Sequence, residues 1–435
     1  MQVTNNQNLK YKNPLIVFIL FYTTILIGFF FNEDSLGGAR VDFIHHYEIS
    51  LKFSKNFLET FQNFGSFEEG MDTRNSPVFW IFISFLNNFI SEDILRILNS
   101  FVSILIGLVF LKCLRVKFES IKLSTLIILS SVIFLSPTIR SLSIWPYTYI
   151  WGLFFFIVSI YYFLIFLKEN DNNKKFNLSL KSITFVVFSS YIYPSFAIFF
   201  LYYYLYYVFY FKISKRLFYI TFYSLIFSLP ALYYIVEKDV ITSFTHAQGI
   251  STSLSESLNI SNKIIIISTM ILFFILPIIN LNELVRKLKS IKILPLTIMF
   301  IFFVLNIYFF NFPSMKVGGF GGGFFYKLSN LIFENNYLFF FAFLISIITI
   351  YLTTFRNWNN YFIYLLLILF NPQLTIYNKY YDPLIYIIFL LLINFDVNKH
   401  FFEKKYNYLQ LYFLYVAYLI MGLLKPLVGF SKLLY

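Results

Sequence analysis

The side chains best suited to chemistry follow directly after the first apolar run of the sequence. They are three carboxylates, Glu33, Asp34 and Asp42, and two neighbouring imidazoles, His45 and His46. Asp42, His45 and His46 stand at positions i, i+3 and i+4, so on a helix they share one face. Such a carboxylate can act as general base towards a hydroxyl group, with an imidazole as hydrogen-bond partner. Asp42 is equally suited to cap the helix N-terminus, and the two roles are compatible.

A helix is expected directly around these residues. The stretch from Phe43 to Phe64 alternates apolar and charged residues in the manner of a helix lying on a membrane surface. Two flexible glycines, Gly37 and Gly38, precede it. The apolar residues at helical intervals are Ile44, Tyr47, Leu51, Leu58 and Phe61.

Support for a metal site in this segment is weak. His45 and His46 are adjacent, so on a helix their side chains point about 100° apart. The segment contains no Asp-x-Asp motif, and Glu33 or Asp34 with one histidine would be the ligands of any divalent ion. The single cysteine, Cys113, excludes a disulfide framework and a multi-cysteine metal site. We therefore predict no metal and no cofactor, with a divalent ion as the alternative.

The composition places these residues in a membrane protein. Of 435 residues, 59% are hydrophobic and 13% charged, whereas soluble domains have roughly 45 to 50% and about 25%. The 61 Phe, 35 Tyr and 4 Trp exceed what a single globular core buries, and the mean hydropathy is +0.71. We therefore predict an all-α polytopic membrane protein.

Apolar runs bounded by polar or basic clusters predict about 11 to 13 membrane crossings. The run from Ser182 to Phe211 is too long for one untilted helix, and Tyr193-Pro194 predicts a break into two short halves, because proline removes a backbone donor. The run from Val78 to Ile90 is too short to span and is expected along the interface. The predicted runs are 14 to 31, 94 to 111, 123 to 139, 147 to 167, 183 to 211, 217 to 235, 264 to 281, 293 to 311, 336 to 355, 358 to 371, 383 to 395 and 408 to 424.

Charge asymmetry predicts the orientation. Loops on one side of the membrane hold 21 of the 34 Lys and Arg residues and only six of the 21 acids. The positive-inside rule then places the N-terminus in the cytoplasm and the loop 32 to 93 outside. The run from Pro14 to Phe31 leads into Asn32-Glu33-Asp34 without a small-x-small cleavage site, so we expect a retained anchor. The expected location is the cytoplasmic membrane, with the active face outside.

The chain is expected to form one integral-membrane domain over residues 1 to 435, with juxtamembrane helices in the loop 32 to 93 and no soluble domain. No repeat and no Walker or Rossmann glycine pattern is present, so nucleotide-driven chemistry is not expected. None of the predicted spans carries an ionisable residue near its centre. This argues against ion-coupled transport, because coupling ions are held by charged groups at mid-membrane depth.

Three segments resemble glycosyltransferases of the GT-C superfamily, which use polyprenyl-phosphate-linked sugars. The family pattern is an acidic residue soon after the first span, a Pro-Pro-Leu-aromatic interfacial segment and an Arg-Leu-Pro-Ser-like start to the second span. This chain departs from it with Ser76-Pro77 and with no proline after Arg96, and the resemblance covers about residues 14 to 120. The matching segments are Asp42-Phe43-Ile44-His45, Arg74-Asn75-Ser76-Pro77-Val78-Phe79-Trp80 and Leu95-Arg96-Ile97-Leu98-Asn99-Ser100.

The resemblance implies transfer of a sugar from a polyprenyl-phosphate donor to a lipid-linked or glycan acceptor, in an inverting reaction of surface-glycan synthesis. Asp42 would deprotonate the acceptor beside His45, with Glu33 and Asp34 as further candidates for the base. The donor keeps its isoprenoid tail in the bilayer and its phosphate at the outer interface, so outer-face cations should lie near the carboxylate. The available cations are Arg74, Arg140, Lys327 and Lys379.

Other interpretations stay open. Any one of these cations taken singly is more often a side chain that reaches from the apolar region to the interface. The glycine run from Gly318 to Gly323 suits a backbone approach to a phosphate, and equally a flexible turn. More loosely, two further segments are similar to parts of membrane proteins from bacterial surface-polysaccharide clusters: Ser136-Pro137-Thr138-Ile139-Arg140 with Trp145-Pro146, and Asn371-Pro372-Gln373 through Lys379-Tyr380-Tyr381-Asp382-Pro383. The alternative functions are a polysaccharide polymerase using lipid-diphosphate repeats and a flippase or transporter for lipid-linked saccharides. Membrane lipids are expected partners, and nucleic acid is not.

Overall fold

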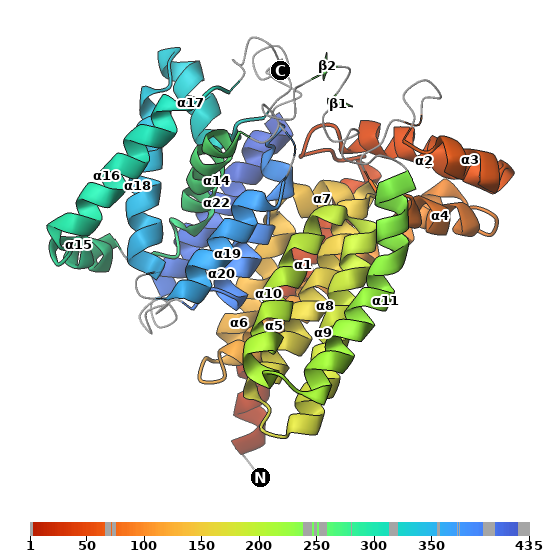
Figure 1. Ribbon diagram of the computed structural model, residues 1–435, viewed down its shortest axis with the longest axis horizontal. Coiled ribbons are helices and arrows are strands. Elements are labelled where there is room, and N and C mark those ends of the chain that lie inside the picture. The colour runs from red at the N-terminus through yellow and green to blue at the C-terminus, as the bar shows by residue number, and fades with distance from the viewer. Residues whose placement is uncertain are drawn as a thin grey trace. The chain divides into compact units, whose positions relative to one another are not determined.

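The computed structural model shows an almost wholly helical chain in two compact units, Met1–Phe244 and Thr245–Tyr435 (Figure 1). Each unit is described by itself, and the expectation of one integral-membrane domain stays a prediction. The structure describes all residues except 1–2, 66–70, 72–74, 238–245, 248–249, 252–258, 280, 313–320, 355–356, 372, 374, 395–404 and 425–435.

The first unit is a bundle in which α8 packs against both α5 and α9, and α9 also contacts α11. At one end of the bundle α2 and α3 run across the direction of the long helices, and α4 packs on α2 (Figure 1). The elements of this unit are α1 Val3–Phe30, α2 Ala39–Lys55, α3 Phe57–Asn63, α4 Pro77–Leu86, α5 Glu92–Lys117, α6 Leu123–Ser131, η1 Val132–Leu135, α7 Pro137–Ile144, α8 Thr148–Lys168, α9 Asn172–Ile192, η2 Pro194–Ala197, α10 Ile198–Phe211 and α11 Lys215–Glu237.

The second unit centres on α14, which packs against α16, α17, α18, α19 and α20. A short antiparallel pair, β1 with β2, places Ala247 opposite Ile250. The elements are β1 His246–Ala247, β2 Ile250–Ser251, α14 Ile260–Ile275, α15 Leu281–Lys289, α16 Ile293–Tyr308, α17 Gly323–Phe333, α18 Tyr337–Thr354, α19 Trp358–Leu369, η4 Asn378–Tyr380, α20 Leu384–Leu391 and α22 Lys405–Leu424.

Within the described residues, five helices are long and apolar enough to cross a membrane, or six if a bent pair counts as one span. This confirms the class of all-α membrane protein, whereas the predicted 11 to 13 crossings are not confirmed. The predicted runs 264 to 281, 293 to 311 and 358 to 371 form helices of 16, 16 and 12 residues, shorter than the roughly 20 residues that a span requires. The five candidate spans are Glu92–Lys117, Thr148–Lys168, Pro194–Phe211, Lys215–Glu237 and Tyr337–Thr354.

Proline positions two of the breaks between helices. The predicted break at Tyr193-Pro194 is confirmed, because α9 ends at Ile192 and η2 follows; α9 has 21 residues, however, so the first half is not short. The run 123 to 139 was expected to be one span and is instead bent by 65° before Pro137. Ser136 accepts a hydrogen bond from the Ile139 amide and Pro137 occupies the first turn, so a new helix starts there.

The expected surface helix 43 to 64 is two helices, because Asn56 ends α2 and caps α3 by accepting the Glu59 amide. Ile44, Leu51 and Leu58 point outward and are exposed. The inward face of α2 is instead made of residues such as Phe43, His46, Ser50 and Phe53.

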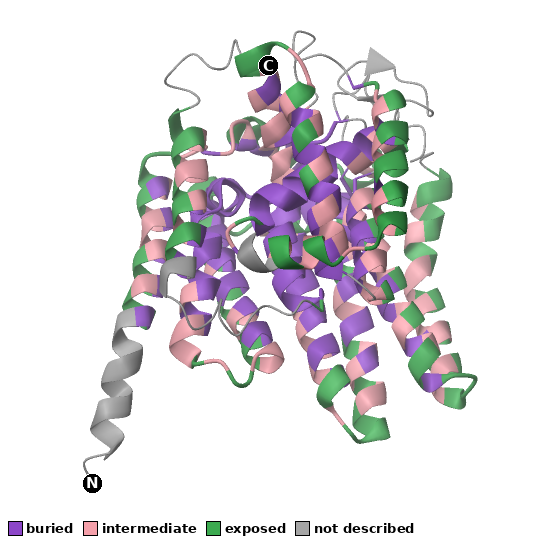
Figure 2. Cartoon of the chain, turned by 90° about the vertical axis from the view of Figure 1, so that its left-hand side faces the viewer, coloured by how far each residue is buried: buried purple, intermediate pink, exposed green. Residues whose placement is uncertain are grey.

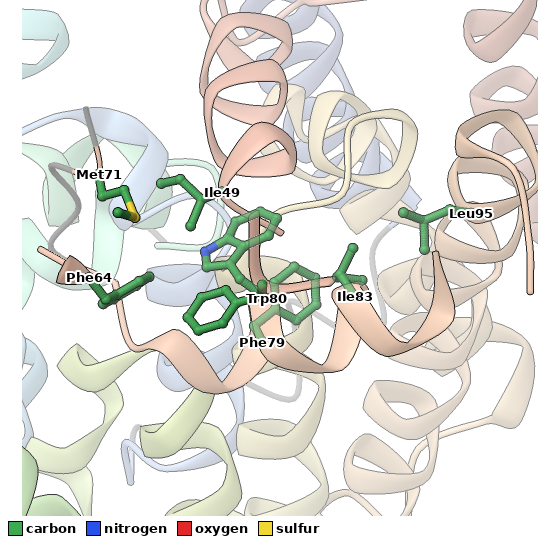
Figure 3. Close-up of a cluster of buried hydrophobic side chains, with 8 residues drawn as sticks. Ile49, Phe64, Met71, Phe79, Trp80, Ile83 and Leu95 are labelled. Carbon is green, nitrogen blue, oxygen red and sulfur yellow. The ribbon is translucent and has the colours of Figure 1, made fainter. Parts of the chain in front are cut away.

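A cluster of buried apolar side chains holds α2 and α4 together (Figure 3). Trp80 and Phe79 of α4 lie in it beside Ile49 of α2. Two polar contacts lie between the same two helices. The Ser54 hydroxyl donates to the Ser84 carbonyl at 2.9 Å, and the Asn87 amide donates to Ser50 at 3.0 Å.

Buried and exposed positions alternate along most helices (Figure 2), whereas all eight residues of α7 are buried.

The predicted orientation can be tested by cysteine labelling, since the native Cys113 is buried and will not react. Ser91 and Lys174 are exposed and fall on opposite sides of the membrane in the predicted topology. We expect Ser91→Cys to react with a membrane-impermeant maleimide in intact cells, and Lys174→Cys to react only after permeabilisation. The wild-type protein serves as the blank. The reverse pattern would contradict a cytoplasmic N-terminus.

Candidate functional site

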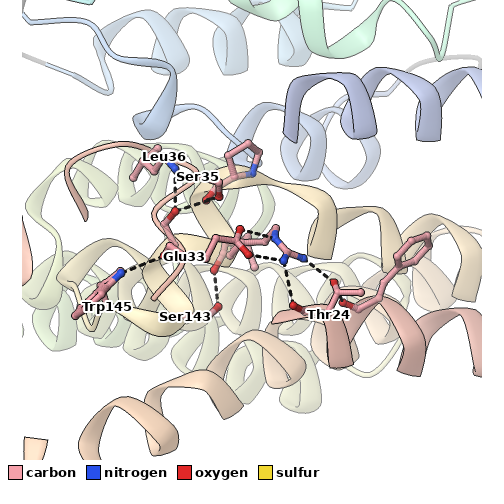
Figure 4. A network of polar contacts seen from close by, with 11 residues as sticks. Thr24, Glu33, Ser35, Leu36, Ser143 and Trp145 are labelled. Atoms are coloured by element: carbon pink, nitrogen blue, oxygen red, sulfur yellow. Dashed lines mark hydrogen bonds and ion pairs between the residues drawn. The ribbon is translucent and has the colours of Figure 1, made fainter. Parts of the chain in front are cut away.

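An ion pair buried on both sides joins the end of α1 to α7 (Figure 4). Arg140 Nε donates to Glu33 Oε1 at 2.7 Å and Nη2 donates to Oε2 at 2.5 Å, and each side chain is about 7% exposed. The guanidinium also donates to the Thr24 hydroxyl at 2.6 Å and to the Thr24 carbonyl at 3.0 Å. Four of its five N–H groups are therefore engaged inside the protein.

The loop after α1 is fastened to α7 and to the residue that follows it. The indole Nε1 of Trp145 donates to the Glu33 carbonyl at 3.1 Å. The Ser141 hydroxyl accepts the Leu36 amide at 2.9 Å and lies 3.2 Å from the Ser35 hydroxyl (Figure 4). Because these contacts bind backbone groups of the loop as well as side chains, they fix the path of the chain through the loop.

Asp34 holds the start of α2. Its two carboxylate oxygens accept the amides of four successive residues, Gly37, Gly38, Ala39 and Arg40, at 2.9 to 3.3 Å. Gly37 and Gly38 have φ of 75° and 99°, a left-handed conformation that glycine adopts without strain. The helix begins at Ala39 with Gly38 as its N-cap, so Asp42 lies within the first turn. Asp42 was expected to be able to cap the helix, but Asp34 supplies the carboxylate.

A polar network ties the turn that carries Asp42 to two other elements. His46 Nδ1 donates to the Asp42 carbonyl at 2.7 Å, which leaves Nε2 to accept the Asn75 amide at 3.1 Å. This arrangement requires the neutral imidazole, protonated at Nδ1. Asn75 also donates to the Tyr147 hydroxyl at 3.0 Å and accepts from the Thr148 hydroxyl at 3.2 Å. The network thus joins α2 to the segment before α4 and to the start of α8.

The buried His46 is also held by stacking. Its ring stacks on Trp80 with centroids 5.0 Å apart, and the ring of His45 meets it edge-on at 5.1 Å. His45 and Asp42 are half-buried. The spacing from Asp42 predicts His46 on the same helix face as an imidazole partner, and the structure shows that His46 contacts the Asp42 backbone carbonyl. Asn75 stands in the segment 74 to 80 quoted for the resemblance, but the sequence does not predict its contacts.

The structure brings some of the predicted site residues together within the first unit. Glu33 and Arg140 meet, and Asp34, Asp42 and His45 lie in or beside α2. Arg74 lies outside the described residues. The second unit carries the other two cations. Lys327 in α17 is half-buried, and the ammonium group of Lys379 in η4 lies 5.5 Å from the centroid of the Tyr377 ring.

Arg96, which the sequence analysis names only in the segment 95 to 100 quoted for the resemblance, is buried. Its guanidinium lies 3.9 Å from the centroid of the Trp145 ring and donates to Asn32 Oδ1 at 2.8 Å and to the Ile144 carbonyl at 3.3 Å. It thus supports the Glu33 loop from the side of α5. An arginine near the start of an apolar run was the available signal.

Among the described residues, no group of three or more His, Cys, Asp or Glu side chains could hold a metal ion. The absence of a cofactor stays a prediction. Comparison of the chain with protein-family models, curated proteins and solved structures finds no match. The likeness to the GT-C superfamily therefore rests on the short segments quoted from the sequence.

Removing one partner of the buried ion pair should destabilise the first unit. We expect Glu33→Gln or Arg140→Gln to lower the free energy of unfolding by about 3 to 5 kcal/mol, because a desolvated charge is left alone. The double variant should lose less than the two single effects added together. Thermal unfolding in detergent measures this.

The matched control is Glu119→Gln, which breaks the 2.7 Å pair with Lys168 at an exposed position. That change should cost no more than about 1 kcal/mol. Equal losses for Glu33→Gln and Glu119→Gln would show that the pair at α7 does not stabilise the fold.

Proposed function

We propose that this protein is a membrane glycosyltransferase that transfers a sugar from a polyprenyl-phosphate donor to a lipid-linked or glycan acceptor at the outer face of the cytoplasmic membrane. The observation that carries the proposal is the place of Asp42, which lies half-buried in the first turn of α2, where the buried His46 donates to its backbone carbonyl at 2.7 Å. The other two carboxylates of the loop have structural tasks, because Arg140 binds Glu33 and four backbone amides bind Asp34. Asp42 is accordingly our candidate for the base.

In the proposed reaction the Asp42 carboxylate takes the proton of the acceptor hydroxyl. The acceptor oxygen forms a bond to the anomeric carbon, and the bond from that carbon to the phosphate oxygen breaks. Polyprenyl phosphate leaves with the electron pair, and the proton stays on Asp42. Because attack and departure occur on opposite faces of the sugar, the anomeric configuration is inverted.

Leaving-group stabilisation requires a cation near the donor phosphate. Arg140 was expected to supply it, but its contacts to Glu33 and Thr24 leave one N–H for any ligand. We therefore assign Arg140 a structural role and assign the phosphate to Arg74, which directly precedes Asn75 in the sequence. Lys327 and Lys379 stay candidates from the second unit.

Replacement of the base should stop transfer without unfolding the protein. We expect Asp42→Asn to lower the rate by about 10² to 10⁴, the usual contribution of a positioned base. The assay is transfer of a radiolabelled sugar from polyprenyl monophosphate by the reconstituted protein, beside thermal unfolding. Glu48→Gln, an exposed change on the same helix, is the matched control and should keep full activity.

Two results would contradict the assignment of Asp42 as the base, and a third would contradict the proposed donor. Near-normal transfer by Asp42→Asn would remove it as the base. A Glu33→Gln variant that is folded but inactive would move the role to Glu33. Turnover with lipid-diphosphate repeats but not with the monophosphate donor would favour the polymerase alternative.

The two arginines should respond differently to lysine. Lysine keeps the charge but lacks the planar fork that binds two oxygens at once. Arg74→Lys should raise KM for the donor while the melting temperature stays unchanged, whereas Arg140→Lys should lower the melting temperature. Unchanged donor kinetics in Arg74→Lys would remove Arg74 from the phosphate site.

A further inference from the structure

Lys263, near the start of α14, is a buried cation in the second unit, with only 4% of its surface exposed. The two buried arginines of the first unit have acceptors, since Arg140 binds Glu33 and Arg96 donates to Asn32. The Lys263 side chain, by contrast, forms no ion pair and no hydrogen bond with any residue that the structure describes. Because a desolvated ammonium group is costly without a counter-charge, Lys263 is suited to receive an anion.

The described carboxylates of the second unit do not supply this counter-charge. Two carboxylate side chains are described there, Glu334 and Asp382, and neither pairs with Lys263. Glu334 is exposed at the C-cap of α17. That helix has eleven residues, so its two ends lie roughly 16 Å apart. Within the described part of this unit, an anion for Lys263 is therefore best supplied by a ligand.

The other end of α17, its N-terminus, packs against the stripe of α14 that carries Lys263. A Cβ on Gly323 would lie 3.1 Å from Met270 Cε and 3.6 Å from Ile266 Cγ2. Ile266 and Met270 follow Lys263 by one and two turns of the helix, so the three side chains share a face. A lysine side chain is long enough to cover one such turn. The ammonium group and the start of α17 are thus within reach of one ligand.

The start of α17 has hydrogen-bond donors for that ligand. Its N-cap is Gly322, and no described side chain caps its first amides. Amides at a helix N-terminus bind anions, and the helix dipole adds to the attraction. The glycine turn itself is used otherwise, because the Gly322 amide donates to the Ile376 carbonyl at 2.9 Å. The donors that remain are therefore those of the helix.

Both parts of the site are held in place by the backbone. The Asn262 amide donates to the Asn311 carbonyl at 2.8 Å, and Asn262 Oδ1 accepts the Asn311 amide at 2.9 Å. This pair of bonds fixes the turn of α14 from which Lys263 projects, as the bond from Gly322 to Ile376 fixes the start of α17. A ligand therefore has little chain to order when it binds.

We propose that Lys263 and the first amides of α17 bind a phosphate group. The ammonium group of lysine is a compact charge that suits phosphate, and the phosphate oxygens also accept backbone amides. A phosphate monoester carries a charge of about −1.5 to −2 at pH 7, enough to balance one buried ammonium group. The same chemistry fits a free phosphate and the headgroup of a lipid phosphate. The proposal concerns the second unit alone and does not depend on the transferase assignment.

Thermal unfolding of the full-length protein in detergent tests the site. Inorganic phosphate should raise the melting temperature of the wild type by about 2 to 4 °C relative to chloride at the same ionic strength. Lys263→Met should show no such shift. Without phosphate this variant should unfold at the wild-type temperature or above it, because an unpaired buried charge is removed. The exposed Lys289→Met is the matched control and should respond to phosphate as the wild type does.

Dodecyl phosphate distinguishes the two sources of the phosphate group. A larger shift with dodecyl phosphate than with the inorganic ion would assign the site to a lipid phosphate, and equal shifts would assign it to the free ion. Acetylation of lysine amines, followed by mass spectrometry, gives a second measurement. Phosphate should slow the reaction of Lys263 several-fold, because it covers the amine and favours the charged form. The rate at Lys289 should stay unchanged.

Three outcomes would overturn the proposal. Equal stabilisation by phosphate and chloride would show that no phosphate site exists. A phosphate shift that persists in Lys263→Met would place the bound ion elsewhere. A Lys263→Met variant that unfolds well below the wild type without phosphate would show that Lys263 serves the fold. In that case an equal loss in Glu256→Gln, a carboxylate seven residues earlier, would identify its counter-charge.

Discussion

The buried ion pair between Glu33 and Arg140 is the interaction on which the end of the first unit depends. Two desolvated charges offset each other only while both stay in place, because either one alone would be costly to bury. The pair fixes Glu33, in the loop that follows α1, against the middle of α7. Asp34 directly follows Glu33 and accepts the amides at the start of α2. The ion pair at Glu33 therefore also fixes where α2 begins. The place of Asp42, one turn further, follows from these two steps.

The same loop is held from a second direction by aromatic and cationic groups. Arg96 lies over Trp145, and the Trp145 indole donates to the Glu33 carbonyl. A guanidinium on an aromatic face is weakly hydrated, so it tolerates this enclosed position better than an ammonium group would. Two arginines from different helices therefore support one short loop. Support by packed neighbours is what a site needs if its groups are to stay within a fraction of an ångström of a working geometry.

The sequence is sufficient for features that depend on local chemistry. Apolar runs predict the helices, Pro194 predicts a break, and the short run at α4 is correctly separated from the spans. The partners of polar groups are not predictable in this way, because Glu33 and Arg140 are 107 residues apart. The inward face of α2 is not predicted by a hydrophobic stripe, because its buried positions include His46 and Ser50. These two side chains bond to Asn75, just before α4, and to Asn87, just after it. The bend of the run 123 to 139 at Pro137 was not predicted, although the same proline signal predicts the break at Pro194.

The carboxylates that follow α1 have different tasks, and their contacts show which task each one has. Glu33 neutralises a buried cation and Asp34 satisfies helix amides, so both answer the need to pair polar groups where helices end. For Asp42 the relevant contacts are those of the neighbouring imidazole, His46. Both ring nitrogens are engaged, Nδ1 with the Asp42 carbonyl and Nε2 with Asn75. In this arrangement the imidazole positions the turn that carries Asp42 and is not available to carry a proton. Our proposal accordingly gives proton transfer to the Asp42 carboxylate and gives His46 the task of positioning the turn that carries it.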